Sequence, residues 1–212
     1  MRRLMVLEMV TLDGVMQAPG GRDEDPRGGF THGGWSAPYN DQVKMQVMGE
    51  GMSRRTDMLF GRWTYEKFYH VWHGRTDNPF TAVFERSQKY VASRTLKGPL
   101  PWVKSTLLEG DAADAVAELK EQPGLDLLVM GSGMLAQSLM RRGLVDEFQL
   151  LIHPLVLGSG RRLFTDDVPR SALRLVKSVP TTTGVIIATY EPVDRAAIAT
   201  GEPVDRAAAA GV

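Results

Sequence analysis

The chain of 212 residues carries 25 lysines and arginines against 25 aspartates and glutamates, and it contains no cysteine. The balanced charge excludes an overall electrostatic attraction to nucleic acid or to an anionic membrane, and the lack of cysteine excludes disulfides, thiolate metal sites and a cysteine nucleophile. A hydrophobic share of 43% is typical of a globular protein, and no apolar run is long enough to span a bilayer. We therefore expect one cytoplasmic α/β domain that acts on a small-molecule substrate, without a nucleic-acid or membrane partner.

Apolar runs of strand length recur along the chain, and helical patterns separate several of them. Strands are expected at residues 4–10, 58–60, 89–92, 127–130, 148–152, 173–176 and 185–190. Helices are expected at residues 40–55, 111–122 and 134–142. The alternation of strand and helix predicts a mostly parallel sheet with helices on both faces. The final strands have no helix between them, so they are expected to be antiparallel.

Two segments fall outside this alternation. Residues 12–38 form a long loop with seven glycines. Because the loop also carries Phe30 and Trp35, which are costly to leave in water, we interpret it as folding over a ligand site. Near the end of the chain, the sequence EPVDRAA at 191–197 recurs at 202–208. We expect the domain to cover residues 1–192, and a tail without a chemical role to cover residues 193–212.

The most informative stretch is DLLVMGSGMLAQSLMRR, at residues 126–142. An apolar run breaks into Gly131-Ser132-Gly133, and Met134 and Leu135 follow in a helical pattern. This order predicts a buried strand, a glycine turn and a helix start, whose free N–H groups and positive dipole end favour a phosphate. Gly-x-Gly turns also occur where nothing binds, so the motif needs support from other segments.

Two further strand ends give that support. In GRWTYE, Gly61 ends a strand, and Arg62 and Thr64 fall in the first turn of a helix, where a guanidinium, a hydroxyl and free N–H groups can meet a phosphate. Ser93 and Arg94 follow the strand at 89–92. A site for NAD would need an acidic residue at such a position, whereas a hydroxyl and a guanidinium suit the 2′-phosphate of NADP. If a dinucleotide binds, the sequence favours NADPH.

The order of these motifs resembles that of the dihydrofolate-reductase-like superfamily, and more closely that of bacterial proteins related to the reductase domain of riboflavin biosynthesis. The resemblance covers roughly residues 2–192. Its motifs are TLDG at 11–14, GRWTYE at 61–66, the strand ending in SR at 93–94, VMGSG at 129–133 and PLVLGSGRRLF at 154–164.

The resemblance implies a three-layer fold in which NADPH lies across the carboxyl ends of the strands. It implies that Gly61, Arg62 and Thr64 meet the cofactor phosphates. It also implies that Ser93 and Arg94 meet the 2′-phosphate, and that the pyrophosphate lies against Gly131, Ser132, Gly133, Met134 and Leu135.

The chain departs from this family at the proton donor. Dihydrofolate reductases carry an acidic residue on the first helix, which binds the pteridine and assists its protonation. Asp41 is the nearest candidate for a catalytic acid, and Trp35 and Asp41 are candidate substrate-binding residues. Asp41 fits a helix-capping carboxylate equally well. A phosphate-bearing substrate would call for cations, for which Arg161 and Arg162 are candidates.

The leading hypothesis is an NADPH-dependent oxidoreductase that transfers hydride to a small pteridine- or pyrimidine-like heterocycle, or to a carbonyl or imine. The alternative is a nucleotide-binding or regulatory protein that keeps the NADPH cleft without turnover. Among the four histidines, only His70 and His73 have a ligand-like spacing, and no recognisable carboxylate partner accompanies them, so no metal is expected. The resemblance also leads us to expect a homodimer.

Overall fold

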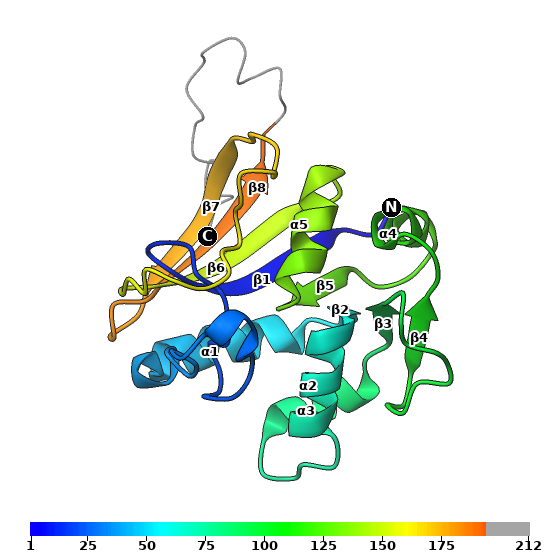
Figure 1. Cartoon of the computed structure of the whole chain (residues 1–212), viewed down its shortest axis with the longest axis horizontal. Coiled ribbons are helices and arrows are strands. Elements are labelled where there is room, and N and C mark those ends of the chain that lie inside the picture. Colours follow the sequence, from blue (N-terminus) through cyan, green and yellow to red (C-terminus); the bar gives the residue numbers. More distant parts are fainter. Residues whose placement is uncertain (194–212) are drawn as a thin grey trace.

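The computed structural model of the chain describes residues 1–193, and its central layer is an eight-stranded sheet (Figure 1). The strands are β1 (Leu4–Thr11), β2 (Asp57–Gly61), β3 (Lys89–Ala92), β4 (Ser105–Leu108), β5 (Leu127–Met130), β6 (Glu147–His153), β7 (Leu173–Pro180) and β8 (Ile186–Pro192). The helices are α1 (Gln42–Ser53), α2 (Arg62–Trp72), α3 (Pro79–Arg86), α4 (Ala112–Glu121) and α5 (Gly133–Arg141). Two short 3₁₀ turns, Arg27–Gly29 and Ala37–Tyr39, lie in the long loop before α1. Residues 194–212, which include the second EPVDRAA copy and all of the predicted tail at 193–212 except its first residue, lie outside the described residues.

The sheet has the strand order β4-β3-β2-β5-β1-β6-β8-β7. Every pair from β4 to β6 is parallel, whereas β8 pairs antiparallel with both β6 and β7. The predicted mixed sheet with antiparallel final strands is confirmed. The sequence reading missed β4 and α3, because β4 is a short edge strand without a continuous apolar run and α3 is only 8 residues long.

The two faces of the sheet bury two separate hydrophobic clusters. Alternate residues of β1 point to opposite faces, so Val6 and Val10 pack with α4 and α5, while Leu7 belongs to the cluster that includes Tyr65 of α2 and Phe84 of α3. The central strand is therefore buried on both sides, as expected for a parallel sheet covered by helices. No helix within residues 1–193 is long and apolar enough to cross a membrane.

The helices differ in how they begin. Asp41, Asn78 and Asp111 cap α1, α3 and α4 with side-chain oxygens that accept backbone N–H groups. In contrast, α2 begins after Gly61 and α5 after Ser132, and neither residue makes a side-chain cap to its own helix. The first N–H groups of α2 and α5 are therefore left for other partners.

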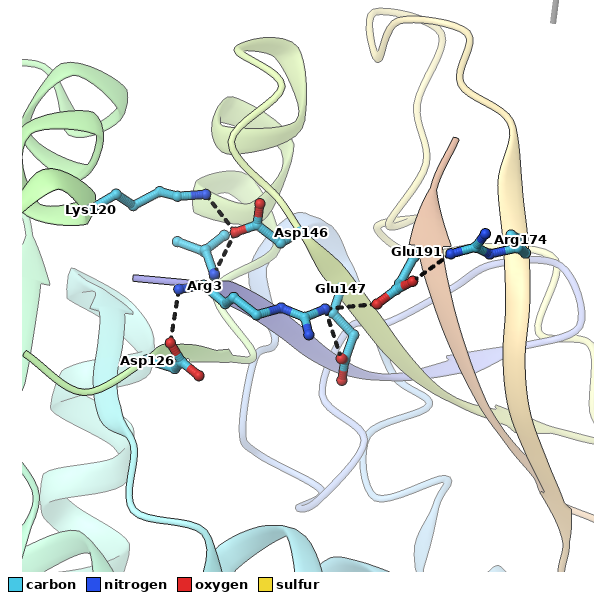
Figure 2. A network of polar contacts seen from close by, with 8 residues as sticks. Arg3, Lys120, Asp126, Asp146, Glu147, Arg174 and Glu191 are labelled. Atoms are coloured by element: carbon cyan, nitrogen blue, oxygen red, sulfur yellow. Dashed lines mark hydrogen bonds and ion pairs between the residues drawn. The ribbon is translucent and has the colours of Figure 1, made fainter. Parts of the chain in front are cut away.

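The amino ends of the central strands are closed by a network of charges (Figure 2). Arg3, just before β1, donates its backbone N–H to Asp126 Oδ1 at 2.8 Å. Its guanidinium meets Glu191 Oε1 at 2.8 Å and Glu147 Oε2 at 3.4 Å. A second part of the network joins Lys120 of α4 to Asp146, whose carboxylate also accepts the N–H of Leu4. The starts of β1, β5 and β6 are thereby fixed together.

We predict that Asp146→Ala lowers the free energy of unfolding by about 2 kcal/mol, because it leaves the buried Lys120 ammonium without its carboxylate and the Leu4 N–H without its acceptor. Urea denaturation followed by circular dichroism measures the change. Asp114→Ala is the matched control: its pair with Arg142 is solvent-exposed, so its removal should cost less than about 1 kcal/mol. Equal losses in the two variants would contradict the role given to Asp146.

Candidate active site

A cleft of about 710 Å³ opens at the opposite edge, where the parallel strands end. Its walls come from segments far apart in the sequence. They include Glu8 of β1, residues 16–19, 24, 25 and 27 of the long loop, residues 61–64 and 66–68 at the start of α2, residues 92–94 after β3, residues 110–112 before α4, residues 131–135 at the start of α5, and Arg161. The parallel sheet brings these ends together because all of its central strands run in the same direction.

The beginnings of α2 and α5 form one continuous wall of this cleft. The Gly61 N–H donates to Ser132 Oγ at 2.8 Å, which links the two turns directly. Gly131 has φ +70°, and a Cβ placed there would lie 3.2 Å from Thr64 Cγ2. Ser132 is also left-handed, with φ +65°. These contacts aim two uncapped helix N-termini at the same space, an arrangement that favours a bound anion.

The cationic end of the cleft lies beside β3. The Arg62 guanidinium bonds Glu66 Oε1 at 2.9 Å and Thr95 Oγ1 at 2.8 Å, so it links α2 to the turn after β3. In that turn Ser93 Oγ accepts the N–H groups of Thr95 and Leu96, while the Arg94 side chain is exposed at the cleft. The structure thus places all of the predicted cofactor-binding residues in one cleft.

The long loop covers the other end of the cleft. Trp63 Nε1 of α2 donates to the carbonyl of Glu24 at 3.2 Å, and the Arg27 guanidinium lies 4.1 Å from the centre of the Trp63 ring. The side-chain amide of Gln17 donates to the carbonyls of Asp25 and Arg27, which joins two parts of the loop. Residues 16–19, 24, 25 and 27 of the loop thus line the cleft, and the binding of a ligand beneath the loop stays a prediction.

The segment at 154–164 also reaches the cleft. The Arg161 N–H donates to Gln17 Oε1 at 3.0 Å, and Arg161 lines the cleft, whereas Arg162 bonds the carbonyl of Asp13. The Asp13 carboxylate accepts the N–H groups of Leu157 and Gly158. Asp13 also accepts the hydroxyl of Thr11, so it joins the end of β1 to a segment 144 residues away.

Asp41 and Trp35 do not line the cleft. Asp41 Oδ1 accepts the N–H of Lys44, and Asp41 Oδ2 accepts both the N–H and the hydroxyl of Thr182 at 2.6 Å. These bonds, first of all the Thr182 hydroxyl, lower the pKa of Asp41 to about 2, so Asp41 is a poor source of a proton near neutral pH. Trp35 is buried and donates its Nε1–H to the carbonyl of Gln17. The geometry gives both residues structural roles.

Glu8 is the acidic residue that the sequence reading missed. It lies in the middle of β1, is 4% exposed, lines the cleft, and its Oε1 has no hydrogen-bond partner. Burial, followed by the negative charge of Glu24, raises the pKa of Glu8 to about 8. The available signal was a single carboxylate inside an apolar run, LMVLEMVT, immediately before TLDG.

Solved structures with a similar arrangement of strands and helices show the fold class of this protein. A putative riboflavin biosynthesis protein from Shewanella sp. PV-4 matches with a TM-score of 0.63 at 22% identity, over 92% of this chain and 100% of that chain. Dihydrofolate reductase from Enterococcus faecalis, complexed with NADP(H) and RAB-propyl, matches with a TM-score of 0.59 at 14% identity, over 91% of this chain and 97% of that chain. The protein therefore has the dihydrofolate-reductase-like fold.

Within this class, the sequence matches the family model of the RibD C-terminal domain over residues 2–187, and the chain belongs to that family. The uncharacterized protein YyaP of Bacillus subtilis (strain 168) is 30% identical over 196 residues, which are 89% of this chain and 94% of YyaP. The superfamily resemblance drawn from the motifs is confirmed.

The buried carboxyl of Glu8 should make the free energy of unfolding depend on pH. Between pH 4.5, the ordinary pKa of a glutamate, and about pH 8, folded Glu8 keeps a proton that the unfolded chain releases. The contribution of Glu8 to the free energy of unfolding is fully present below pH 4.5 and is lost as pH rises through about 8. We predict that Glu8→Gln removes this loss, which amounts to at most about 1.4 kcal/mol per pH unit within the window.

Urea denaturation of both proteins at pH 5, 6, 7 and 8 measures the effect. The wild-type free energy of unfolding should fall relative to that of Glu8→Gln as pH rises. The exposed Glu118 of α4 supplies the control, Glu118→Gln, which should follow the wild type. Parallel curves for wild type and Glu8→Gln would show that Glu8 ionises at an ordinary pH.

Proposed function

We propose that the protein is an NADPH-dependent reductase that transfers hydride to a small substrate with a C=N or C=O bond, such as a pteridine- or pyrimidine-like heterocycle. One observation carries the proposal: the uncapped N-termini of α2 and α5 are joined by the Gly61–Ser132 hydrogen bond and share a cleft with Ser93 and Arg94. This donor set is suited to the pyrophosphate and 2′-phosphate of a dinucleotide.

In this proposal, the phosphates lie along the wall formed by the two helix starts. The free N–H groups of Arg62 and Thr64 on one side, and of residues 132–135 on the other, would hold the pyrophosphate. Gly61 and Gly131, whose own N–H groups bond Ser132 Oγ and the Leu7 carbonyl, would let it approach the backbone closely. Ser93 and Arg94 would hold the 2′-phosphate, because no carboxylate occupies positions 93–95 to select ribose hydroxyls instead. The family membership and the dihydrofolate-reductase-like fold support this assignment.

In this mechanism the cofactor would supply the hydride, and the protein would position the reactants. NADPH, when bound, supplies the hydride from C4 of its nicotinamide. The chain's own residues would align the two reactants and exclude water, with the loop segment around Gln17 and Glu24 as the cover. Arg27 and Trp63 fix that cover to α2. A proton must still reach the reduced nitrogen or oxygen.

A nucleotide-binding protein without turnover is the second candidate. The observation that favours it is the position of Asp41, which is bonded to Thr182 outside the cleft and is not available as the expected proton donor. Fluorescence of bound NADPH, followed by a panel of pterin, pyrimidine, nitro and carbonyl compounds, separates the two. NADPH oxidation that depends on one of these compounds supports the reductase; tight binding with no oxidation supports the second candidate.

The cofactor assignment predicts a selective effect of Arg94→Ala. Loss of a guanidinium opposite a phosphate should weaken NADPH binding by about 10- to 100-fold, because a charge-assisted hydrogen bond contributes about 1.5–3 kcal/mol. NADH, which lacks the 2′-phosphate, should bind with nearly unchanged affinity. Isothermal titration calorimetry with both nucleotides measures the difference.

Arg170→Ala is the matched control, since Arg170 is exposed and lies outside the residues lining the cleft. It should leave both affinities unchanged. Equal losses for NADPH and NADH in Arg94→Ala would remove Arg94 from the 2′-phosphate site, and a wild-type protein that binds neither nucleotide would overturn the proposed function itself.

A further inference from the structure

Glu8 occupies a position where the fold calls for an apolar residue. Val6 and Val10, two residues to either side on the same face of β1, belong to the hydrophobic core beneath α4 and α5. A carboxyl group in such a place costs free energy unless it is hydrogen-bonded, yet Glu8 Oε1 is buried without a partner. Packing alone therefore does not explain the residue.

The surroundings of Glu8 open toward the cleft. Glu8 lines the same cavity as Met16 and Gly133, and a Cβ at Gly133 would overlap the Met16 side chain. The α5 turn from Gly131 to Leu135 contributes no charged side chain. An unpartnered carboxyl thus stands in an apolar, glycine-lined part of the wall, next to the loop that covers the cleft.

The charged groups around the cover are already engaged with other partners. The Arg27 guanidinium bonds both oxygens of Asp25 at 2.6 Å, and Arg161 Nη1 lies 3.8 Å from Asp25 Oδ2. Glu24 Oε2 accepts the N–H groups of Gly20 and Gly21. Lys67 lies 5.2 Å from the centre of the Trp63 ring, and its Nζ donates to the carbonyl of Asp23 at 3.4 Å.

Within residues 1–193, no ion pair includes Glu8, and the charge that affects its pKa is the negative charge of Glu24. Both burial and this repulsion favour the neutral, protonated carboxyl, which raises its pKa to about 8. A protonated carboxyl is a hydrogen-bond donor as well as an acceptor, and it holds its proton at the pH of the cell.

We propose that Glu8 is the proton donor of the reduction, a role that rests on the proposed function of the cleft. In this step the O–H bond of Glu8 breaks, and its proton forms a new N–H or O–H bond on the substrate C=N or C=O group. The adjacent substrate carbon receives the hydride from the reduced nicotinamide. The Glu8 carboxylate then regains a proton from water once the products leave, so atoms and charges balance over one turnover.

The first test needs no substrate. The phosphates of NADPH disfavour a second negative charge in the cleft, so binding should raise the pKa of Glu8, and ionised Glu8 should in turn weaken binding. For a rise of one unit, the wild-type affinity for NADPH should weaken about fivefold more between pH 7 and pH 9 than that of Glu8→Gln. Calorimetric titration of the full chain at pH 6, 7, 8 and 9 measures both series.

The second test uses the reduction rate of a pterin and of the other compounds in the panel. Glu8→Gln keeps the size and polarity of the side chain but cannot release a proton at neutral pH, so kcat should fall by about 10²- to 10⁴-fold. Glu8→Asp keeps an acid and should recover part of that loss. The wild-type rate should fall as pH rises through the pKa of Glu8, whereas the residual rate of Glu8→Gln should not.

Glu147→Gln is the matched control, because Glu147 is a half-buried carboxylate on the neighbouring strand β6 that lies outside the cleft. It should behave as wild type in both tests. If NADPH binds but wild type and Glu8→Gln share the same pH dependence of affinity, or the same kcat and pH profile, Glu8 is not the proton donor. If the wild type does not bind NADPH, the proposed function itself is refuted.

Discussion

The parallel pairing of β2, β5, β1 and β6 is the constraint on which the rest of the molecule depends. Parallel strands place all their carboxyl ends at one edge, so the helices that follow β2 and β5 begin side by side. The hydrogen bond from Gly61 to Ser132 is possible only because of that register. The same constraint leaves β1 in the centre of the sheet, with its last residues at the mouth of the cleft.

The two edges of the sheet have opposite characters as a result. At the amino edge, Arg3, Lys120 and Asp146 satisfy their charges within the protein and fix the strand starts. At the carboxyl edge, the first N–H groups of α2 and α5 and the carboxyl of Glu8 are left unsatisfied by side-chain caps or partners. The amino edge is closed by ion pairs, whereas the carboxyl edge keeps unfilled hydrogen-bonding capacity that a ligand can use.

The sequence predicts what is local and misses what depends on distant contacts. Strand, glycine turn and helix follow one another directly around Gly61 and Gly131, so the wall that we propose to bind phosphate can be predicted from the spacing of these residues. The helix-capping role of Asp41 is visible in the sequence, whereas its bonds to Thr182, which is 141 residues away, are not. Glu8 has a visible signal, a charge in an apolar strand, but its meaning requires knowing that β1 is central and that this face meets α5.

The close packing of the two turns also limits how this protein can diverge. A side chain at position 131 would press on Thr64, and the hydroxyl at position 132 is the acceptor for the amide of Gly61. Because position 131 also has φ +70°, it favours glycine whatever residue stands at 64, and loss of the hydroxyl at 132 leaves an amide 71 residues away without its acceptor. Positions 131 and 132 should therefore vary little among related sequences, although the residues that restrict them belong to a different motif.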